Sequence, residues 1–432
     1  EQHRMVLRHR YRPSPGTTVT SSIAPKLFKT IFRQQSEEIG LDNGFKLEVQ
    51  GVDLRETIDM EISDWLTFSA GAELDMVDAT VSIAFPIPTE LKKYPSPAFD
   101  FTDNQDISEL TEGYNHAYWA ELILKPHESL KLIPGLRLQR FDVGSFQDYG
   151  IQPRITARWE VTEETALKLA FGLYDKSPEA RFTARTTGNP NLKPLRAQHY
   201  VAGFEHWFNE LIQLDLQFFY NKRYRLPTPS TKVTFENGVA EYEWFNSRGS
   251  GQAYGLELLL RALPEPNGWY YGWVSYTLSK ATVRDQLRDF SGSRGGGGRS
   301  PNNSGTDELE TYTSNFDQPH ILTVVAQFEL PWSLEFGFRF RYVSGNPTTD
   351  LTQAANTLDV DGGDYEVDTS SIARNSSRLP DFHQLDLRID KNFTFDTWKL
   401  ACFLEVLNAY NASNVEAYNY SYDYRQKSAF TL

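Results

Sequence analysis

The stretch Glu335 to Tyr342, EFGFRFRY, has an aromatic side chain at every even position. Its odd positions hold one glutamate, one glycine and two arginines. Successive side chains of a β-strand point to opposite faces, so the stretch predicts a strand with one aromatic face and one charged face. A strand between lipid and a wet lumen has this character, because its outer face is apolar and its inner face is polar.

The same period of two recurs along the chain. Gln213 to Tyr220 reads QLDLQFFY, and Gln384 to Asp390 reads QLDLRID. The apolar faces lie opposite full charges such as Asp215 and Asp386. These patterned segments run for roughly 10–14 residues, which matches tilted membrane strands better than the ~5–6 residues of a globular sheet.

Short and long connections alternate between these segments. Tight turns are expected at Pro126–Ser129, Thr162–Thr165, Asn209–Glu210, Pro264–Gly268, Pro331–Trp332 and Phe395–Thr397. Long polar loops are expected at about Pro86–Glu112, Ser177–Arg196, Arg225–Gly249, Arg284–Asn315 and Gly345–Leu379. Outer-membrane barrels have short periplasmic turns and long extracellular loops. The sequence therefore predicts an all-β, transmembrane antiparallel β-barrel with strictly alternating connection lengths and about sixteen strands.

Aromatic side chains gather near the predicted strand ends, where they are expected to form interfacial girdles. They are Tyr118, Trp119, Trp269, Tyr270, Tyr271, Trp273, Trp332 and Trp398.

Composition excludes several other classes of protein. Hydrophobic residues make up 40% of the 432 residues and aromatic residues 14%, yet no segment has the ~18–20 consecutive apolar residues of a transmembrane helix. The net charge of -14 argues against a nucleic-acid partner, which would require a basic surface. The single cysteine, Cys402, excludes a disulfide framework within the chain.

The segment Leu173 to Phe208 resembles TonB-dependent outer-membrane receptors. Its Gly188 to Pro194, GNPNLKP, resembles the Gly-Asn-Pro-x-Leu-x-Pro element of the family, and Tyr200, Gly203 and Glu205 follow as in the family's next strand. Leu195 stands where the family commonly has glutamate. Looser matches extend the resemblance from about Gly113 to the C-terminus.

The resemblance implies a bacterial outer-membrane barrel of about 22 strands around a plug domain. Neither a plug nor a TonB-contacting box is recognisable, and the chain stops at Ala429-Phe430-Thr431-Leu432 beyond the last recognised strand, Leu400 to Leu407. We therefore expect residues 1–432 to be a barrel-domain fragment, with about five strands missing at the N-terminus and one at the C-terminus.

No catalytic arrangement and no cofactor site is recognisable. The eight histidines lack metal-ligand spacing, and the glycines of Arg294 to Gly305 lack the residues of a phosphate loop. An acidic loop, Leu358 to Asp368, offers Asp359, Asp361 and Asp364 as a weak calcium candidate; a solvated acidic surface loop is the preferred interpretation, because the bidentate glutamate is absent. The chain is not expected to be an enzyme.

Before the GNPNLKP element, Arg181 and Arg185 lie close in sequence to the aromatic residues Tyr174 and Phe182. Charge-assisted hydrogen bonds from these arginines would suit an anionic ligand such as a ferric siderophore. The alternative is that they contact lipopolysaccharide phosphates or only keep the loop soluble.

The function that the resemblance implies is TonB-energised uptake of a large, scarce ligand, such as a ferric siderophore, cobalamin or an oligosaccharide. The expected partners are the TonB complex through an N-terminal plug, the lipid bilayer with its lipopolysaccharide, and an unknown extracellular ligand. A passive porin would share the alternation and the girdles. A soluble β-propeller or lectin-like protein would show blade repeats, which are not recognisable here.

Overall fold

The computed structural model describes residues 2–36, 41–85, 105–183, 188–230, 232–236, 239–265, 268–285, 309–353, 373–421 and 424–431. Nearly all of this chain forms one antiparallel sheet. In spatial order its strands are β1 (Gln2–Arg4) with β2 (Leu7–Ser14), β3 (Thr17–Ser36), β4 (Leu41–Ser63), β5 (Leu66–Phe85), β6 (Gln105–His127), β7 (Leu130–Val143), β8 (Phe146–Glu160), β9 (Thr165–Lys176), β10 (Leu195–Trp207), β11 (Ile212–Pro229), β14 (Phe245–Ala262), β15 (Tyr270–Asp285), β16 (Glu310–Thr313) with β17 (His320–Leu330), β18 (Leu334–Val343), β21 (Phe382–Thr394) and β22 (Lys399–Val406).

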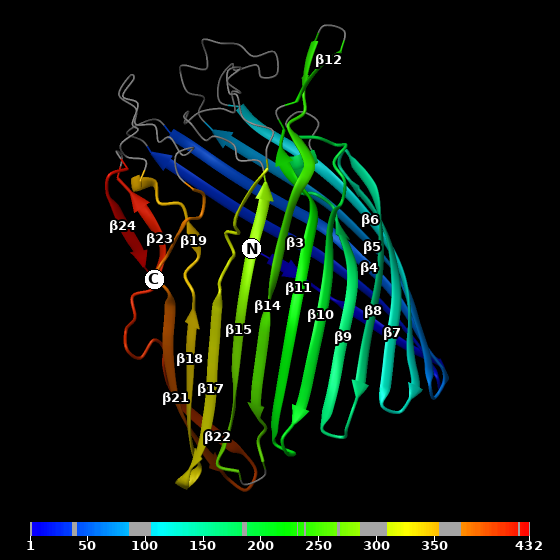
Figure 1. Cartoon of the computed structure of the whole chain (residues 1–432), viewed down its shortest axis with the longest axis vertical. Coiled ribbons are helices and arrows are strands. Elements are labelled where there is room, and N and C mark those ends of the chain that lie inside the picture. Colours follow the sequence, from blue (N-terminus) through cyan, green and yellow to red (C-terminus); the bar gives the residue numbers. More distant parts are fainter. Residues whose placement is uncertain are drawn as a thin grey trace.

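The number of strands agrees with the predicted number. Both β1 and β2 pair with β3, and both β16 and β17 pair with β15, so the eighteen elements occupy sixteen positions in the described part of the wall. Each strand pairs with the next one along the chain. Figure 1 shows the resulting curvature, with the blue strands β3, β4 and β5 crossing behind the green strands.

Smaller elements lie between the wall strands. They are α1 (Ala180–Thr183), the hairpin β12 (Val233–Glu236) and β13 (Val239–Tyr242), the 3-10 turn η2 (Pro331–Ser333), the pair β19 (Pro347–Thr348) and β20 (Ser377–Arg378), and the hairpin β23 (Val415–Tyr420) and β24 (Lys427–Thr431). Neither helix in the described residues is long or apolar enough to cross a membrane.

The tight turns on one rim are confirmed, and side chains hold several of them. Between β10 and β11 the Asn209 Oδ1 accepts hydrogen bonds from the backbone N–H groups of Leu211 and Ile212, at 2.9 and 2.8 Å. An asparagine that bonds its own backbone two or three residues on stabilises a turn.

The predicted strict alternation of connection lengths is wrong. On the loop rim, Gly144 and Ser145 alone join β7 to β8, and the positive φ of 56° at Gly144 permits the tight turn. Only residues 37–40 separate β3 from β4. The predicted loop Arg225–Gly249 is also largely strand, because β11 and β14 extend into it and the β12–β13 hairpin lies between them.

The strands β3 to β6 are longer than predicted, with 20 to 23 residues each. A strand tilted by about 45° needs only about 9–11 residues to cross the bilayer. The sheet therefore continues well beyond the membrane on the loop side, and the short connections 37–40 and 144–145 belong to this extension.

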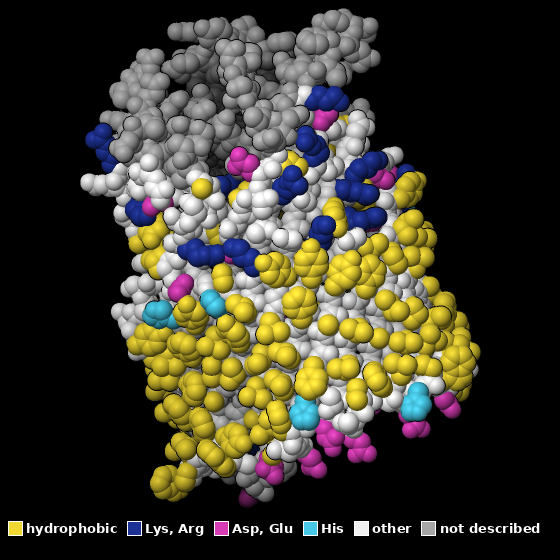
Figure 2. All heavy atoms as spheres, viewed as in Figure 1, with side chains coloured by type: hydrophobic (Ala, Val, Ile, Leu, Met, Phe, Trp, Pro, Cys, Tyr) yellow, Lys and Arg dark blue, Asp and Glu magenta, His cyan; other side chains and the backbone are white. Residues whose placement is uncertain are grey.

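The wall is a single layer, and its outer face is apolar. Figure 2 shows a continuous belt of hydrophobic side chains around the visible face, with acidic and histidine side chains near its lower border. Leu169, Phe218 and Trp332 are 60%, 51% and 80% exposed. Such exposure of large apolar side chains would be unfavourable in water, and it is what contact with lipid requires.

The inner face is charged, as the alternation predicted. The two arginines of the EFGFRFRY stretch lie on the face opposite its aromatic residues, and the Arg339 guanidinium lies 2.6 Å from the Asp386 carboxylate across the β18–β21 pair. Asp386 is only 4% exposed and also accepts a hydrogen bond from the backbone N–H of Asn408.

Strand pairing places two predicted girdle residues, Tyr271 and Trp273, on the inner face, in the rows of Gly337 and Arg339. Trp119 also faces the lumen. Its neighbour Tyr118 is 59% exposed on the outer face, whereas Trp119 is 8% exposed and its ring lies directly over Gly71. The guanidinium carbons of Arg55 and Arg137 lie 4.6 and 5.7 Å from the centroid of this ring. The prediction failed because adjacent strand residues must face opposite sides of the sheet.

We expect Gly71→Ala to destabilise the barrel. A Cβ at this position would lie 2.2 Å from the Trp119 ring and 2.5 Å from the backbone oxygen of Glu56, so the strands must shift. Overpacking of this kind typically costs about 1–3 kcal/mol. The free energy of unfolding in detergent, measured by urea titration, should fall by that amount. Gly337→Ala is the control, because the nearest atom to its added Cβ would be the Ala326 backbone oxygen, 3.7 Å away. Equal stability of the two variants would contradict the packing role of Gly71.

Candidate functional site

The loop-side half of the lumen brings together an aromatic residue, a histidine and an arginine. Tyr174 on β9 and His199 on β10 have ring centroids 4.7 Å apart. Arg223 on β11 lies over Gly251 of β14, where a Cβ would be 3.6 Å from its Nε atom. By strand alternation these three side chains share the inner face with Lys168, whose ion pairs lie farther down the lumen.

A second cation lies on the same inner face four strands farther round the wall. The Arg341 Nη2 donates a hydrogen bond to the Gln384 Oε1 at 2.8 Å, and its guanidinium carbon lies 5.4 Å from the Phe382 ring centroid. Its Nε atom is buried and has no hydrogen-bond partner. An unsatisfied buried donor is costly, and a ligand atom that accepted its hydrogen bond would remove the penalty.

The lower lumen has a different character, because most of its charges neutralise one another. The exception is Arg261 at the turn end of β14, which lies over the Trp207 ring and has no carboxylate partner among the described residues. Across β8 to β11, Glu205 accepts ion pairs from Arg158 at 2.8 Å and from Lys168 at 2.9 Å, and Lys168 also lies 2.7 Å from Asp215. Farther round, Arg154 pairs with Glu121 at 2.8 Å.

Neither Arg223 nor Arg341 pairs with a carboxylate in the described parts of the chain. Two lumen cations that face the loop rim are therefore not neutralised by the wall. Ion pairs therefore predominate in the lower lumen, where Arg261 is unpaired, and the unpaired cations Arg223 and Arg341 lie nearer the loops.

The GNPNLKP element fastens the loop after β9 to β14. Asn189 donates from Nδ2 to the Phe245 backbone oxygen at 2.8 Å, and its Oδ1 accepts from the Asn191 N–H at 2.9 Å. The Lys193 N–H donates to the Ser247 Oγ at 2.9 Å, while Leu192 and Pro194 are buried. The element therefore positions the loop across β10 and β11.

Of the four residues predicted to contact a ligand, the structure describes the side chains of Tyr174 and Phe182, which have different neighbours. Tyr174 contacts His199 in the lumen, whereas Phe182 packs edge-on against Phe245, with centroids 5.0 Å apart. Arg181 lies in α1, and its side chain is outside the described part of the structure, as is the whole of Arg185.

The proposed calcium residues, Asp359, Asp361 and Asp364, also lie outside the described residues. Within the described ranges, no group of three or more His, Cys, Asp or Glu side chains is placed to bind a metal ion.

Sequence reasoning missed the roles of His199 and Arg223. The available signal was their position, since each lies on the charged face of a patterned strand near a long loop. Arg341 had already been assigned to the charged face of its strand, but its lack of an acidic partner depends on the pairing with β21.

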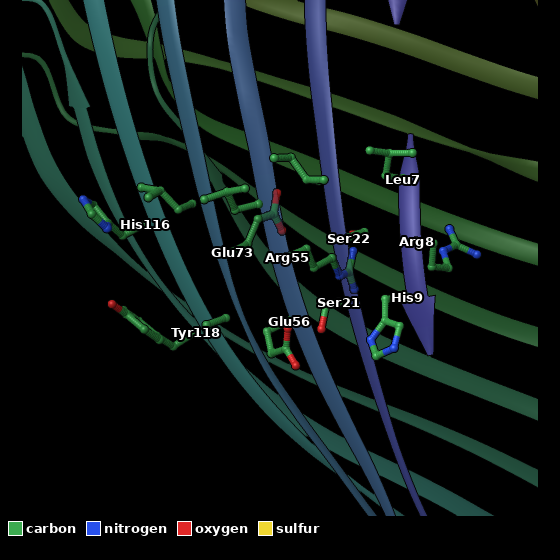
Figure 3. A pocket seen from close by; sticks show the side chains of 14 residues that line it. Leu7, Arg8, His9, Ser21, Ser22, Arg55, Glu56, Glu73, His116 and Tyr118 are labelled. Atoms are coloured by element: carbon green, nitrogen blue, oxygen red, sulfur yellow. The ribbon is translucent and has the colours of Figure 1, made fainter. Parts of the chain in front are cut away.

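A groove of about 610 Å³ crosses β2 to β6 (Figure 3). Two of its rows are set by strand pairing: His9, Ser21, Glu56, Ala72 and Tyr118 on one face, and Arg8, Ser22, Arg55 and Glu73 on the other. Side chains from both faces of a single-layer wall line it because it borders β2, an edge strand of the described sheet. It is not an enclosed ligand cavity, so the loop-side lumen remains the better candidate.

A buried carboxylate joins two segments of the loop rim. Asp317, 1% exposed, accepts a hydrogen bond from the Ala281 N–H at 2.5 Å and pairs with Lys280 at 3.2 Å. Arg378 also bonds this carboxylate, and its Nη1 donates to the Asp317 backbone oxygen at 2.7 Å. The segments on either side of β17 and β18 are therefore held to β15.

The family model described as "TonB dependent receptor-like, beta-barrel" matches residues 7–415. The chain belongs to this family. Its members are proteins of the bacterial outer membrane, so this receptor wall lies there. The members of this family, and the solved structures that are similar to the chain, are transport receptors and not enzymes. No curated protein matches the sequence.

Several solved TonB-dependent receptors share the fold. The ferric yersiniabactin uptake receptor FyuA of Yersinia pestis is 11% identical with a TM-score of 0.65, covering 100% of this chain and 59% of its own. FpvA of P. aeruginosa, bound to pyoverdine, is 11% identical with a TM-score of 0.67, covering 99% and 54%. The ferric-catecholate import receptor Fiu of E. coli K12 is 11% identical with a TM-score of 0.59, covering 96% and 60%. The chain thus spans little more than half the length of these receptors.

The β23–β24 hairpin should be most firmly held near neutral pH. Lys427 lies 2.6 Å from Asp350, and the Tyr420 hydroxyl donates to the Thr349 backbone oxygen at 3.4 Å. The hydrogen bond from Lys427 lowers the pKa of Asp350, and the same bond raises the pKa of Lys427. The contribution of Asp350 to the stability of the hairpin is therefore complete above the ordinary aspartate pKa of about 3.9, and it is lost as the pH falls through the lowered pKa. The Lys427 contribution is complete below about 10.4 and is lost as the pH rises through the raised value.

Hydrogen-exchange protection of residues 415–420 and 427–431, corrected for intrinsic rates, should be constant from about pH 5 to pH 9 and fall on both sides. In Lys427→Met, protection should be lower across this pH range and should no longer fall at alkaline pH, because the variant lacks the titrating ammonium group. A wild-type profile that coincides with the variant's would contradict the role of the ion pair.

Proposed function

We propose that residues 1–432 form the barrel domain of an uptake receptor that works with the TonB complex through a plug domain lying outside these residues. The receptor imports a large, scarce ligand, and the barrel performs no bond chemistry. Its tasks are to hold the wall in lipid and lipopolysaccharide, to present the loops and to line the path of the ligand. The family supports this proposal, and the fold shared with FyuA and Fiu supports it in architecture.

The chemical class of the ligand is inferred from the distribution of charge in the lumen. Most of the lower charges are paired within the wall, with Arg261 as an exception, whereas Arg223 and Arg341 face the loop side without acidic partners among the described residues. An anionic ligand would supply those partners and would gain charge-assisted hydrogen bonds. A ferric siderophore with a net negative charge fits this arrangement better than cobalamin or a neutral oligosaccharide.

Tyr174 and His199 offer stacking surfaces beside Arg223 for the organic part of such a ligand. Arg181 and Arg185 are proposed as additional cationic contacts from the loop that the GNPNLKP element positions. Phe182 supports this loop through its contact with Phe245.

Replacing the two lumen cations should weaken ligand binding. In Arg223→Gln with Arg341→Gln, the affinity for an anionic ferric siderophore should fall at least tenfold, since a hydrogen bond to a charged group contributes about 1.5–3 kcal/mol. Calorimetry with a panel of ferric siderophores, cobalamin and maltooligosaccharides on the full-length receptor measures this effect. Arg154→Gln is the control, because Glu121 already neutralises Arg154. Unchanged affinity in the double variant would reject the lumen site.

The pair Arg181→Ala with Arg185→Ala tests the loop contacts in the same way.

A passive porin is the alternative function. Planar-bilayer recordings of the full-length protein distinguish the two, because a receptor with a plugged lumen should show no steady conductance at about 100 mV. A stable open current without ligand or TonB would favour the porin and overturn the receptor proposal.

A further inference from the structure

Three rows of outward side chains cross β10, β11, β14 and β15 close to the loop rim. Strand pairing places Tyr200, Tyr220, Tyr254 and Lys280 in the lowest row, Gln198, Lys222, Gln252 and Thr282 in the middle row, and Arg196, Tyr224, Ser250 and Arg284 in the upper row. These twelve residues form the basic-aromatic patch.

The patch lies directly above the lipid-facing belt. The row beneath its tyrosines consists of Ala202, Phe218, Leu256 and Leu278, and the last three are 51%, 37% and 43% exposed. Figure 2 shows Lys and Arg side chains gathered along the upper border of the hydrophobic belt. Tyrosines at such a border mark the interface between hydrocarbon and headgroups. The cations therefore lie at the height of the lipid headgroups.

Two of the four cations are already neutralised by the protein. Arg196 makes a bidentate pair with the fully buried Asp175 carboxylate, with both distances 2.7 Å, and Lys280 pairs with Asp317. Lys222 lies 4.9 Å from the Tyr224 ring centroid, and Arg284 is exposed. Within the described residues, neither Lys222 nor Arg284 has a carboxylate partner.

Polar groups suited to an anion lie between these two cations. Ser250 and Gln252 belong to β14, the strand that separates β11 from β15. The Gln252 Oε1 accepts a hydrogen bond from the Tyr220 hydroxyl at 3.4 Å, which leaves its amide N–H groups as donors. Since neighbouring strands are about 4.8 Å apart, Lys222 and Arg284 are close enough to converge on one group above β14.

We propose that the basic-aromatic patch binds a phosphate group of the glycolipid in the outer leaflet, the phosphorylated lipid A part of lipopolysaccharide. Lys222, Arg284, Ser250 and Gln252 hold the phosphate, while the tyrosine row and the apolar row beneath it contact the sugar and the acyl chains. Charge complementarity selects an anion, and the adjoining apolar belt selects an anion that carries hydrocarbon. This proposal deepens the contact with lipopolysaccharide in the proposed function and rests on it, but it requires no transport.

The test measures binding of diphosphoryl lipid A to the delipidated full-length protein in a neutral detergent by native mass spectrometry. Lys222→Gln with Arg284→Gln should weaken lipid A binding at least tenfold. The matched control is Lys29→Gln with Lys46→Gln, which removes two lysines that both pair with Glu48, at 3.0 and 2.8 Å, and should leave the affinity unchanged. The charge-conserving variant Lys222→Arg with Arg284→Lys should retain most of the binding, which separates loss of charge from misfolding.

Two further probes identify the source of the phosphate. Dephosphorylated lipid A should bind the wild-type protein at least tenfold more weakly than diphosphoryl lipid A, and inorganic phosphate at 10 mM should not displace the bound lipid. Equal binding by the Gln variant, equal binding of dephosphorylated lipid A, or displacement by inorganic phosphate would each overturn the proposal. Siderophore binding to the same variants is measured separately, so failure of the lipid site and failure of the receptor function give different results.

Discussion

Lipid offers no hydrogen-bond partner to a peptide group, and the rest of this structure depends on that constraint. Each N–H and C=O within the bilayer must bond to another strand, so the wall is a continuous antiparallel ladder in which each strand pairs with its neighbour along the chain. A single layer has no interior of its own. The two faces of one sheet must therefore meet lipid and water, and the period of two in the sequence follows directly.

The same constraint explains how the inner face is stabilised. Few large hydrophobic side chains are buried in the described residues, and Trp119 is one of them. In place of a core, the wall has cross-strand ion pairs such as Arg158–Glu205 and Arg339–Asp386, together with the stacking of Arg55 and Arg137 on Trp119. These contacts join neighbouring strands of the wall or, as in Arg158–Glu205, strands on either side of one intervening strand. Arg223, Arg341 and, near the turn rim, Arg261 lack such ion pairs among the described residues, and the candidate ligand site lies at the first two because they face the loops.

The fold class was predictable because its determinants are local. Alternation within Glu335 to Tyr342 and the turn residues around Asn209 need no knowledge of tertiary contacts. The orientation of Trp119 was harder to predict, since its neighbour Tyr118 is also aromatic. Glu121, two residues farther along the strand and ion-paired in the lumen, indicates that Trp119 faces inward. The sequence could not predict that Arg223 and Arg341 lack acidic partners. Which charges lie opposite each arginine depends on the register between strands, and the sequence does not reveal that register.

The tyrosine row above the apolar belt has a mechanical consequence. Tyr200, Tyr220 and Tyr254 favour the interface over both the hydrocarbon and bulk water, so displacement of the wall along the membrane normal in either direction costs free energy. The cations above them resist entry into the hydrocarbon still more strongly. In the proposed uptake receptor, a force that draws the ligand toward the periplasm acts against a wall that resists the same displacement. The tyrosines and cations thus hold the wall at a fixed depth, and under the proposed function the force moves the contents of the barrel without moving the barrel itself.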